Sequence, residues 1–401
     1  MRSIAGAPPP GAERALRGPD NGPDEDHASR DARDHATRDA EDHAGRDAAR
    51  AQPRRDHGAQ APIVLPPNQL ARFYRGGARI DRLRGTSGHA DGGPEDWVGS
   101  TTTALGADRA GLSGLPDGRY LCDAIAQDPT GFLGSEHVRR WGSNPALLVK
   151  LLDAGERLPV HFHPGRAFAR QALGLDFGKT EAWIIVAAEA DAVVHLGLKA
   201  PVSKSTILHW VREQDVPAML GAMHELPVQP GATLFVPAGT LHAIGSGILL
   251  VELQEPTDLS VLLEWQRFGV SDGSEHLGLG WERVLDAAVL EPTPAEEEDD
   301  PDGVAVPAKA VTDLLPSAAA PYFRAQRITA QGEPVHLDQS FSILVVLDGW
   351  LKLWSESSDP LDLHAGETAL IPDAAGPTTL DGHALMIRCL PPAPGAGAGK
   401  W

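Results

Sequence analysis

Short apolar stretches separated by glycine or proline dominate the chain from residue 147 to residue 266. They are rich in valine, isoleucine and leucine, which favour strands. The pattern predicts strands near 147–154, 158–163, 181–188, 192–198, 231–237, 247–254 and 259–266. Capping residues and apolar runs predict helices at 121–126, 135–141, 203–223 and 281–290. Many short strands with regular turns are typical of a β-barrel or a β-sandwich, so we expect a mainly β protein with a few helices.

Changes of composition divide the chain into five parts. Residues 1–61 contain an eight-residue repeat whose apolar positions are mostly alanine, so they bury too little area to fold and we expect a disordered tail. We predict a first β domain with helical insertions over 62–290 and a second, smaller barrel over 305–392. An acidic linker broken by proline joins them at 291–304, and 393–401 form a flexible tail.

The bulk composition excludes several classes of partner. The formal net charge of the 401 residues is -20 and there is no basic stripe, so we expect no nucleic-acid partner. No run of about 18 apolar residues occurs, so we expect no membrane span. The start of the chain lacks the apolar core of a secretory signal, and the two cysteines, Cys122 and Cys389, suit a reducing compartment. These features predict a cytoplasmic protein.

Three histidines and one glutamate form the most informative pattern. His161 and His163 lie two residues apart in an apolar, strand-like run, and side chains two apart on a strand face the same way. His242 follows another short predicted strand, and Glu181 begins a third. Three imidazoles and a carboxylate are a ligand set for a divalent transition metal with positions left open for substrate. We therefore predict a metal site at these four residues.

Two motifs connect this ligand set with a known fold. Gly231-x5-Pro237-x-Gly239-x2-His242 matches the second signature motif of the cupin β-barrels. His161-x-His163 matches the first motif, with its glutamate displaced to Glu181. Several flanking segments, over roughly residues 63–270, resemble class I mannose-6-phosphate isomerases: 95–100, 148–152, 179–183, 236–245 and 250–254, with Asp258 beyond them.

The resemblance implies a fold, a cofactor and a reaction. The fold is the cupin-type double-stranded β-helix, or jelly roll, built as two β-barrels with a few helices. The cofactor is one zinc ion per chain, or another divalent metal, with His161 standing where most family members carry a glutamine ligand. The reaction interconverts mannose 6-phosphate and fructose 6-phosphate through an enediol. The resemblance thus implies a small sugar phosphate as substrate, and we expect a monomer or a homodimer.

Aldose–ketose isomerisation needs a base of near-neutral pKa and groups that hold the sugar. Lys179 matches a lysine of the family's site and either shuttles protons or stays charged and holds an anionic substrate. Glu252 lies on an apolar strand and serves either as the base or as a partner of a ligand histidine. We predict these two as catalytic residues, and Lys150, Gln254 and Arg267 as substrate-binding residues.

Departures from the family leave the substrate open. A family serine near the metal strand is Pro159 here, and a family arginine beyond Asp258 is Leu262, so Arg267 replaces that arginine only if the register shifts. The second barrel lacks the family's obvious arginine-bearing segments and any His-x-His pattern, so we expect no metal there.

An arginine fork is the strongest phosphate holder, so the absence of the family arginine weakens the assignment of a phosphorylated substrate. Three alternatives remain. One is an isomerase of another or an unphosphorylated sugar, and the next is a non-catalytic sugar-sensing cupin. The third, an iron-dependent cupin dioxygenase, fits the ligand set but not the flanking motifs.

Overall fold

The structure is a computed structural model that describes residues 58–86, 93–271, 273–294 and 310–395. Most of the predicted tail at 1–61 lies outside the described residues, as do most of the predicted linker at 291–304 and of the predicted tail at 393–401. No helix among the described residues is long and apolar enough to cross a membrane.

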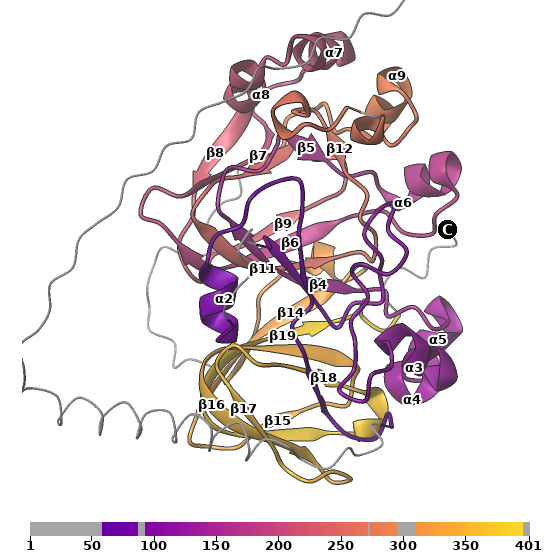
Figure 1. Cartoon of the computed structure of the whole chain (residues 1–401), viewed down its shortest axis with the longest axis vertical. Coiled ribbons are helices and arrows are strands. Elements are labelled where there is room, and N and C mark those ends of the chain that lie inside the picture. Colours follow the sequence, from indigo (N-terminus) through magenta and orange to yellow (C-terminus); the bar gives the residue numbers. More distant parts are fainter. Residues whose placement is uncertain (1–57, 87–92, 272, 295–309, 396–401) are drawn as a thin grey trace, which may run out of the picture. The chain divides into compact units, whose positions relative to one another are not determined.

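The described chain is mainly β, as predicted, and its strands pair antiparallel. The first of three sheets has the strand order β2-β3-β4-β11-β6-β9 (Figure 1). Their bounds are β2 Gln69–Leu70, β3 Glu95–Val98, β4 Leu148–Ala154, β11 Ile248–Gln254, β6 Glu181–Ala188 and β9 Thr233–Val236. β4 and β11 are buried at every position because both of their faces are covered.

The second sheet has the order β12-β5-β10-β7-β8. Its strands are β12 Val261–Leu262, β5 His161–Phe162, β10 His242–Ile244, β7 Val193–Leu198 and β8 Met223–Pro227. The strand predicted at 158–163 is only two residues long, because Pro159 and Pro164 flank it and proline cannot donate a ladder hydrogen bond. β8 and β10 were not predicted.

The third sheet, called the C-terminal sheet below, has the order β1-β18-β16-β19-β14-β13, with β15 paired to β19 and β17 to β16. The bounds are β1 Ile63–Leu65, β13 Val311–Asp313, β14 Arg324–Gln331, β15 Val335–Leu337, β16 Ser342–Ser355, β17 Leu361–His364, β18 Thr368–Ile371 and β19 Thr378–Leu390. Ile63 of β1 pairs with Leu370 of β18, so the first described strand completes the last sheet.

Helices fill the connections between the strands (Figure 1). They are α2 Arg79–Arg84, α3 Leu121–Gln127, α4 Pro129–Leu133, α5 Ser135–Trp141, α6 Arg166–Phe168, α7 Lys204–Glu213, α8 Val216–Ala222 and α9 Trp281–Val284. A π-helical turn, Ala169–Leu173, follows α6, and short 3₁₀ turns are Gln266–Phe268, Ser274–His276, Leu285–Ala287, Ser317–Ala319 and Asp373–Ala375.

Capping residues explain two differences between the predicted and the observed helices. Of the two candidate caps, Ser203 and Ser205, it is Ser203 that caps α7, but Gln214 adopts a left-handed backbone conformation (φ 52°) and Asp215 caps a new helix, α8. The predicted helix at 203–223 is therefore two helices. Asp128 accepts a hydrogen bond from the Gly131 amide, and Pro129 takes the first helical position, so this pair begins α4.

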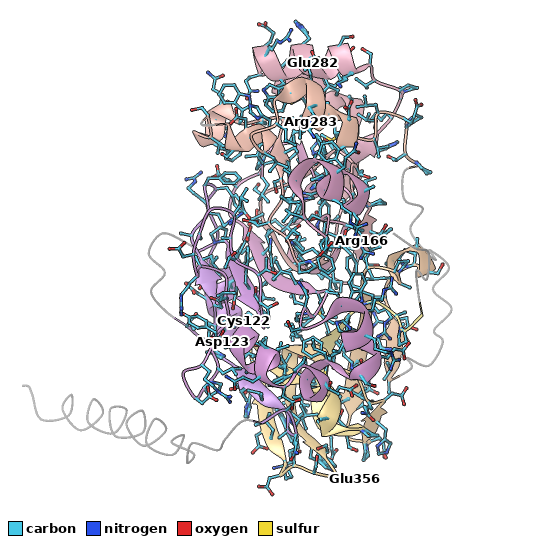
Figure 2. All side chains as sticks on the ribbon, turned by 90° about the vertical axis from the view of Figure 1, so that its right-hand side faces the viewer. Cys122, Asp123, Arg166, Glu282, Arg283 and Glu356 are labelled. Carbon is cyan, nitrogen blue, oxygen red and sulfur yellow. The ribbon has the colours of Figure 1, made fainter. Side chains whose placement is uncertain are left out.

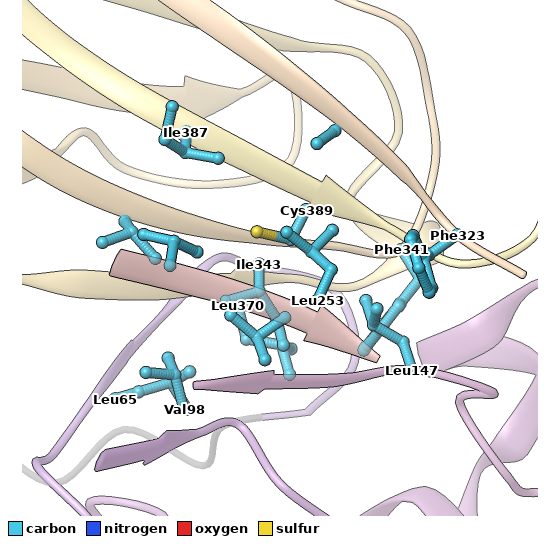
Figure 3. Packing of buried hydrophobic residues seen from close by; sticks show 14 of the residues in the cluster. Leu65, Val98, Leu147, Leu253, Phe323, Phe341, Ile343, Leu370, Ile387 and Cys389 are labelled. Atoms are coloured by element: carbon cyan, nitrogen blue, oxygen red, sulfur yellow. The ribbon is translucent and has the colours of Figure 1, made fainter. Parts of the chain in front are cut away.

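Alternating side chains of the buried strands serve two cores. Val149 and Leu151 of β4 pack with Ile343 and Cys389 in a cluster that joins the first sheet to the C-terminal sheet (Figure 3). Leu152, on the opposite face of β4, packs in a second cluster that includes residues of both the first and the second sheet. The face of the first sheet turned toward the second sheet also carries the polar residues described next.

Candidate metal centre and active site

The three predicted histidine ligands converge between the first and second sheets. His161 begins β5 and His242 begins β10, and these two residues are directly paired across the strands. The two Nε2 atoms lie 2.9 Å apart, and one ligand atom from each of the three histidines falls within 4.8 Å of the others. Within the described part of the chain, this is the only such group of histidine, cysteine or acidic residues. All three imidazoles are buried.

Backbone carbonyls determine which imidazole nitrogen carries the proton. The Nδ1 atoms of His161, His163 and His242 lie 2.8, 2.7 and 2.8 Å from the carbonyl oxygens of Pro159, Leu259 and Thr240. A carbonyl only accepts, so each Nδ1 donates and each Nε2 keeps its lone pair. Lone pairs that face one another at close range repel, and a cation bound between them removes the repulsion. These residues therefore fit a divalent metal.

Glu181, the first residue of β6, adds a carboxylate to the cluster. Its Oε2 lies 3.1 Å from His163 Nε2 and its Oε1 lies 3.3 Å from His242 Nε2. The Trp183 indole donates to Oε1 at 3.0 Å. Burial alone disfavours the charged form of Glu181, but Lys179 and the imidazoles hold its pKa well below the ordinary value. The carboxylate is therefore ionised and able to bind a metal.

Glycine backbone geometry brings the motif of His242 against that of His163. Gly239 has a φ of 90°, and its amide donates to the His163 carbonyl oxygen at 2.7 Å. A Cβ at position 239 would meet the Ala287 carbonyl oxygen at 2.7 Å. Only glycine fits this turn, which connects the two ligand-bearing segments.

A glutamate between two lysines lies beside the metal ligands. Glu252 of β11 pairs directly with Lys150 of β4, and its Oε1 lies 3.4 Å from Lys179 Nζ. Its Oε2 lies 3.7 Å from Lys150 Nζ. Burial raises the pKa of Glu252 to about 7, against the opposing effect of the two lysines. A carboxyl with this pKa exchanges a proton near neutral pH.

Lys179 is held by three acceptors. Its Nζ lies 2.6 Å from Glu181 Oε2 and 2.8 Å from His163 Nε2, in addition to the contact with Glu252. Burial by itself lowers the pKa of Lys179, but Glu181 and Glu252 outweigh it and the pKa is raised. Of the two predicted roles for Lys179, the geometry favours the charged one.

A buried arginine supports the segment that carries Lys179 and Glu181. Arg166 donates from Nε to Glu255 and from Nη2 to the Pro321 carbonyl oxygen at 3.2 Å. Glu255 also accepts from the Thr180 amide at 2.9 Å. Figure 2 shows Arg166 between α9, which carries Glu282 and Arg283, and Glu356, which lies in the turn after β16. Arg166 thus connects the candidate site to the C-terminal part of the chain.

A cavity of about 910 Å³ opens beside the cluster. Its lining includes the predicted residues His161, Glu181, Lys179, Lys150 and Glu252. Pro159 and Leu262, the two departures, also line it. The structure therefore brings the metal cluster, the lysines and the near-neutral glutamate to one solvent-reachable space.

Two of the predicted substrate-binding residues are placed differently. Gln254 pairs with Glu181 across the strands, and its carboxamide oxygen is buried without a hydrogen-bond partner among the described residues. Arg267 lies on a short 3₁₀ turn, where its side chain is 51% exposed and bonds to Glu156 at 3.1 Å. Neither residue is among those that line the cavity.

No protein-family model matches the chain. The chain is 31% identical over 201 residues to a mannose-6-phosphate isomerase of Streptococcus mutans, covering 49% of this chain and 58% of that protein. It is 26% identical over 335 residues to YvyI of Bacillus subtilis, whose name also assigns it to the mannose-6-phosphate isomerases. That second match covers 82% of this chain and 98% of YvyI.

A solved structure extends the comparison to the fold. The mannose 6-phosphate isomerase of Bacillus subtilis aligns with a TM-score of 0.65 over 82% of this chain and 99% of its own, at 22% identity. The chain is similar to mannose-6-phosphate isomerases in sequence and in fold. The resemblance predicted from the sequence is confirmed. The chain spans 58% of the length of the Streptococcus protein.

The structure of this mannose-6-phosphate isomerase relative adds site residues that the sequence reasoning missed. Glu95 of β3 accepts from Tyr74 and from the Trp97 indole (2.6 Å), and it lies 3.5 Å from Lys150 Nζ. Arg72 binds Asp258 through two hydrogen bonds of 2.9 and 3.1 Å. Residues 95–100 resemble a family segment, and this resemblance could have identified Glu95. Arg72 and Tyr74 lie in a stretch where only Gly76 and Gly77 formed a recognisable pattern.

Proposed function

We propose that this protein is a metal-dependent aldose–ketose isomerase that interconverts mannose 6-phosphate and fructose 6-phosphate through an enediol. The observation that carries the proposal is the position of Glu252. This carboxyl has a pKa raised to about 7 and lies next to three buried imidazoles that could hold a metal ion. The similarity to mannose-6-phosphate isomerases supports the same reaction.

The cofactor we propose is zinc, held by His161, His163, Glu181 and His242. When bound, zinc acts as a Lewis acid that stabilises negative charge on the oxygens at C1 and C2 of the sugar. The proposal is supported by imidazole ligands whose Nε2 atoms are unprotonated, since burial lowers the pKa of His163 and of His242 to about 3. These histidines stay neutral at pH 7 and need no proton release before they bind a metal.

We assign the proton transfer to Glu252. In its carboxylate form it removes the proton from C2 of the aldose, and as the acid it gives a proton to C1. The hydroxyl proton on the C2 oxygen passes to the C1 oxygen, so that C1 becomes an alcohol and C2 the ketone carbon. Lys150 and Lys179 lie on either side of it and stabilise the carboxylate form. Lys179, held by Glu181 and Glu252, contributes a fixed positive charge beside the developing enediolate.

Gln254 and Arg267, the other predicted substrate-binding residues, lie outside the lining of the cavity. The carboxamide oxygen of Gln254 has no hydrogen-bond partner among the described residues and is an acceptor for a sugar hydroxyl or a water. Arg267 remains a predicted substrate-binding residue, but its exposed side chain and its pairing with Glu156 give that role little support.

The experiment that tests the proposal follows the transferred hydrogen. Zinc-loaded protein is given mannose 6-phosphate deuterated at C2, and loss of deuterium from C2 and formation of fructose 6-phosphate are measured together. We expect both with the wild type. In Glu252→Gln, kcat is expected to fall by about 10² to 10⁴, because one general base is removed. Glu225→Gln, on the exposed part of β8, is the control. An inactive wild type that binds zinc would contradict the proposal.

A second candidate is an isomerase of another or an unphosphorylated sugar. It is favoured by Pro159 and Leu262, which line the cavity where the resemblance expects a serine and an arginine. Under this alternative, purified protein converts neutral aldoses such as mannose and ignores hexose phosphates. Assays with both sugars at equal concentration separate the two.

The finer architecture and setting are also proposals. The facing first and second sheets support one cupin-type barrel, and the C-terminal sheet supports a second, smaller barrel. The domain limits, a cytoplasmic location, and a monomeric or homodimeric state stay predictions from the sequence.

A further inference from the structure

The cavity contains four cationic side chains, and three of them are paired with carboxylates. Arg72 binds Asp258, Lys150 lies near Glu95 and Glu252, and Lys179 lies near Glu181 and Glu252. The fourth is Arg109, which lines the same cavity. Arg109 forms no ion pair with a carboxylate in the described parts of the chain. Its charge is therefore available to a ligand.

The Arg109 guanidinium has a defined position although it is exposed. Its Cζ lies 4.9 Å from the centroid of the Tyr120 ring, a distance suited to a cation–π contact. A hydrogen bond to Tyr120 and, more weakly, the charge of Asp123 on α3 (Figure 2) raise the pKa of Arg109. Tyr120 also lines the cavity. A guanidinium has five N–H donors, so the hydrogen bond to Tyr120 leaves others able to bind a ligand.

The loop that carries Arg109, residues 99–113, is attached to the site at two points. The Leu105 amide donates to Asp258 Oδ2 at 3.0 Å, and Asp258 is the carboxylate that binds Arg72. The Asn68 side chain donates to the Gly111 carbonyl oxygen at 2.9 Å. Gly111 has a φ of 100°, and a Cβ there would meet the Trp97 ring at 2.7 Å. The loop is thus fitted closely against β3.

We propose that Arg109 binds the phosphate group of the substrate and replaces the arginine that the resemblance expects at Leu262. The inference rests on the proposed function, because it names the residue that holds the phosphorylated end of the sugar. A guanidinium binds phosphate through two parallel, charge-assisted hydrogen bonds, and the contact with Tyr120 reduces the cost of orienting it. A phosphate bound here meets a guanidinium that forms no ion pair with a carboxylate of the described residues.

The first test compares Arg109→Gln with Arg212→Gln, an exposed arginine of α7 outside the cavity. For mannose 6-phosphate, Arg109→Gln is expected to raise KM about tenfold, the equivalent of one lost charge-assisted hydrogen bond, and to leave kcat within about twofold. Arg109→Lys keeps the charge but not the fork of N–H donors. Its KM is expected to lie between those of the wild type and Arg109→Gln. Arg212→Gln is expected to match the wild type. An unchanged KM in Arg109→Gln would overturn the inference.

The second test uses inorganic phosphate alone and needs no turnover. Calorimetry is expected to show phosphate binding to the wild type and to Arg212→Gln, weakened about tenfold in Arg109→Gln. If the wild type fails to isomerise mannose 6-phosphate but shows this pattern, the proposed function fails and the anion site at Arg109 stands. If all three proteins bind phosphate equally, or none binds it, Arg109 is not the anion-binding residue.

Discussion

The space between the first and second sheets and the interior of the C-terminal sheet are both enclosed by antiparallel strands, yet their contents are opposite in character. The former buries three imidazoles, two lysines and three glutamates. The latter buries a cluster of aliphatic side chains that includes Ile328, Leu344, Leu351 and Met386. The histidines of the C-terminal sheet, His336, His364 and His383, all point to solvent. Among the described residues, the buried histidines, lysines and glutamates named here gather where metal and substrate are proposed to bind, whereas the C-terminal sheet buries Arg388 beside its apolar cluster.

The two regions share a strand motif and differ just after it. Gly231 and Gly366 both have a positive φ, 93° and 84°, and each leads through a short strand to a proline. After β9 the chain turns at Gly239 and enters β10 with His242. After β18 it forms a 3₁₀ turn, and the position that corresponds to His242 is Pro377. A similar strand therefore becomes either a ligand-bearing or a structural element, depending on the few residues that follow it.

The largest expected effect comes from replacing a histidine between the first and second sheets by an aliphatic residue, like those buried in the C-terminal sheet. His242→Leu removes one imidazole from the cluster. We expect loss of zinc, measured by elemental analysis of the purified protein, and a fall in kcat/KM by about 10³ or more, because several kcal/mol of metal-supplied stabilisation are lost. His336→Leu, on an exposed position of β15, is the matched control. A His242→Leu protein with full zinc content and activity would show that the cluster is not the metal site.

An intermediate effect on stability is expected from the C-terminal sheet. Leu351 is fully buried in the apolar cluster, whereas its neighbour Trp350 is 48% exposed. Leu351→Ala is expected to lower the free energy of unfolding by about 2–5 kcal/mol, from lost burial and the cavity left behind. Trp350→Ala is expected to change it by about 0.5 kcal/mol or less. Urea denaturation measures both. A fall in the zinc affinity of folded Leu351→Ala would show that packing in the C-terminal sheet affects the metal cluster, which would contradict two independent cores.

A smaller effect is expected from pH on the metal-free protein. The folded pKa of His163 is lowered to about 3 by burial, so below pH 6.5 the unfolded chain takes up a proton that the folded protein excludes. The stability associated with this histidine is complete above pH 6.5 and is lost as pH falls toward 3. At pH 5.5 the loss is about 1 kcal/mol. We expect chelator-treated wild type to lose more stability between pH 7.5 and pH 5.5 than His163→Gln, which cannot titrate. Equal losses would contradict this.

Local patterns predicted much of this protein because they depend only on neighbours in sequence. The strands β4, β6, β7 and β11 begin and end within one residue of their predicted limits. The shared direction of His161 and His163 follows from the two-residue period of a strand, and Ser203 caps α7 because its hydroxyl reaches an amide three residues on. Motif order added Glu181 and His242 to the ligand set.

Only the tertiary structure decided which distant groups meet. Arg72 binds Asp258, 186 residues away, and β1 joins the sheet formed by the far end of the chain. The prediction of a single helix at 203–223 failed because the backbone turns left-handed at Gln214, whose side chain bonds to residues near β12. Sequence alone does not distinguish the positions of Arg109 and Arg267, yet Arg109 lines the cavity and Arg267 pairs with Glu156. Such contacts depend on how all strands bury their apolar faces together, which no local window of the sequence contains.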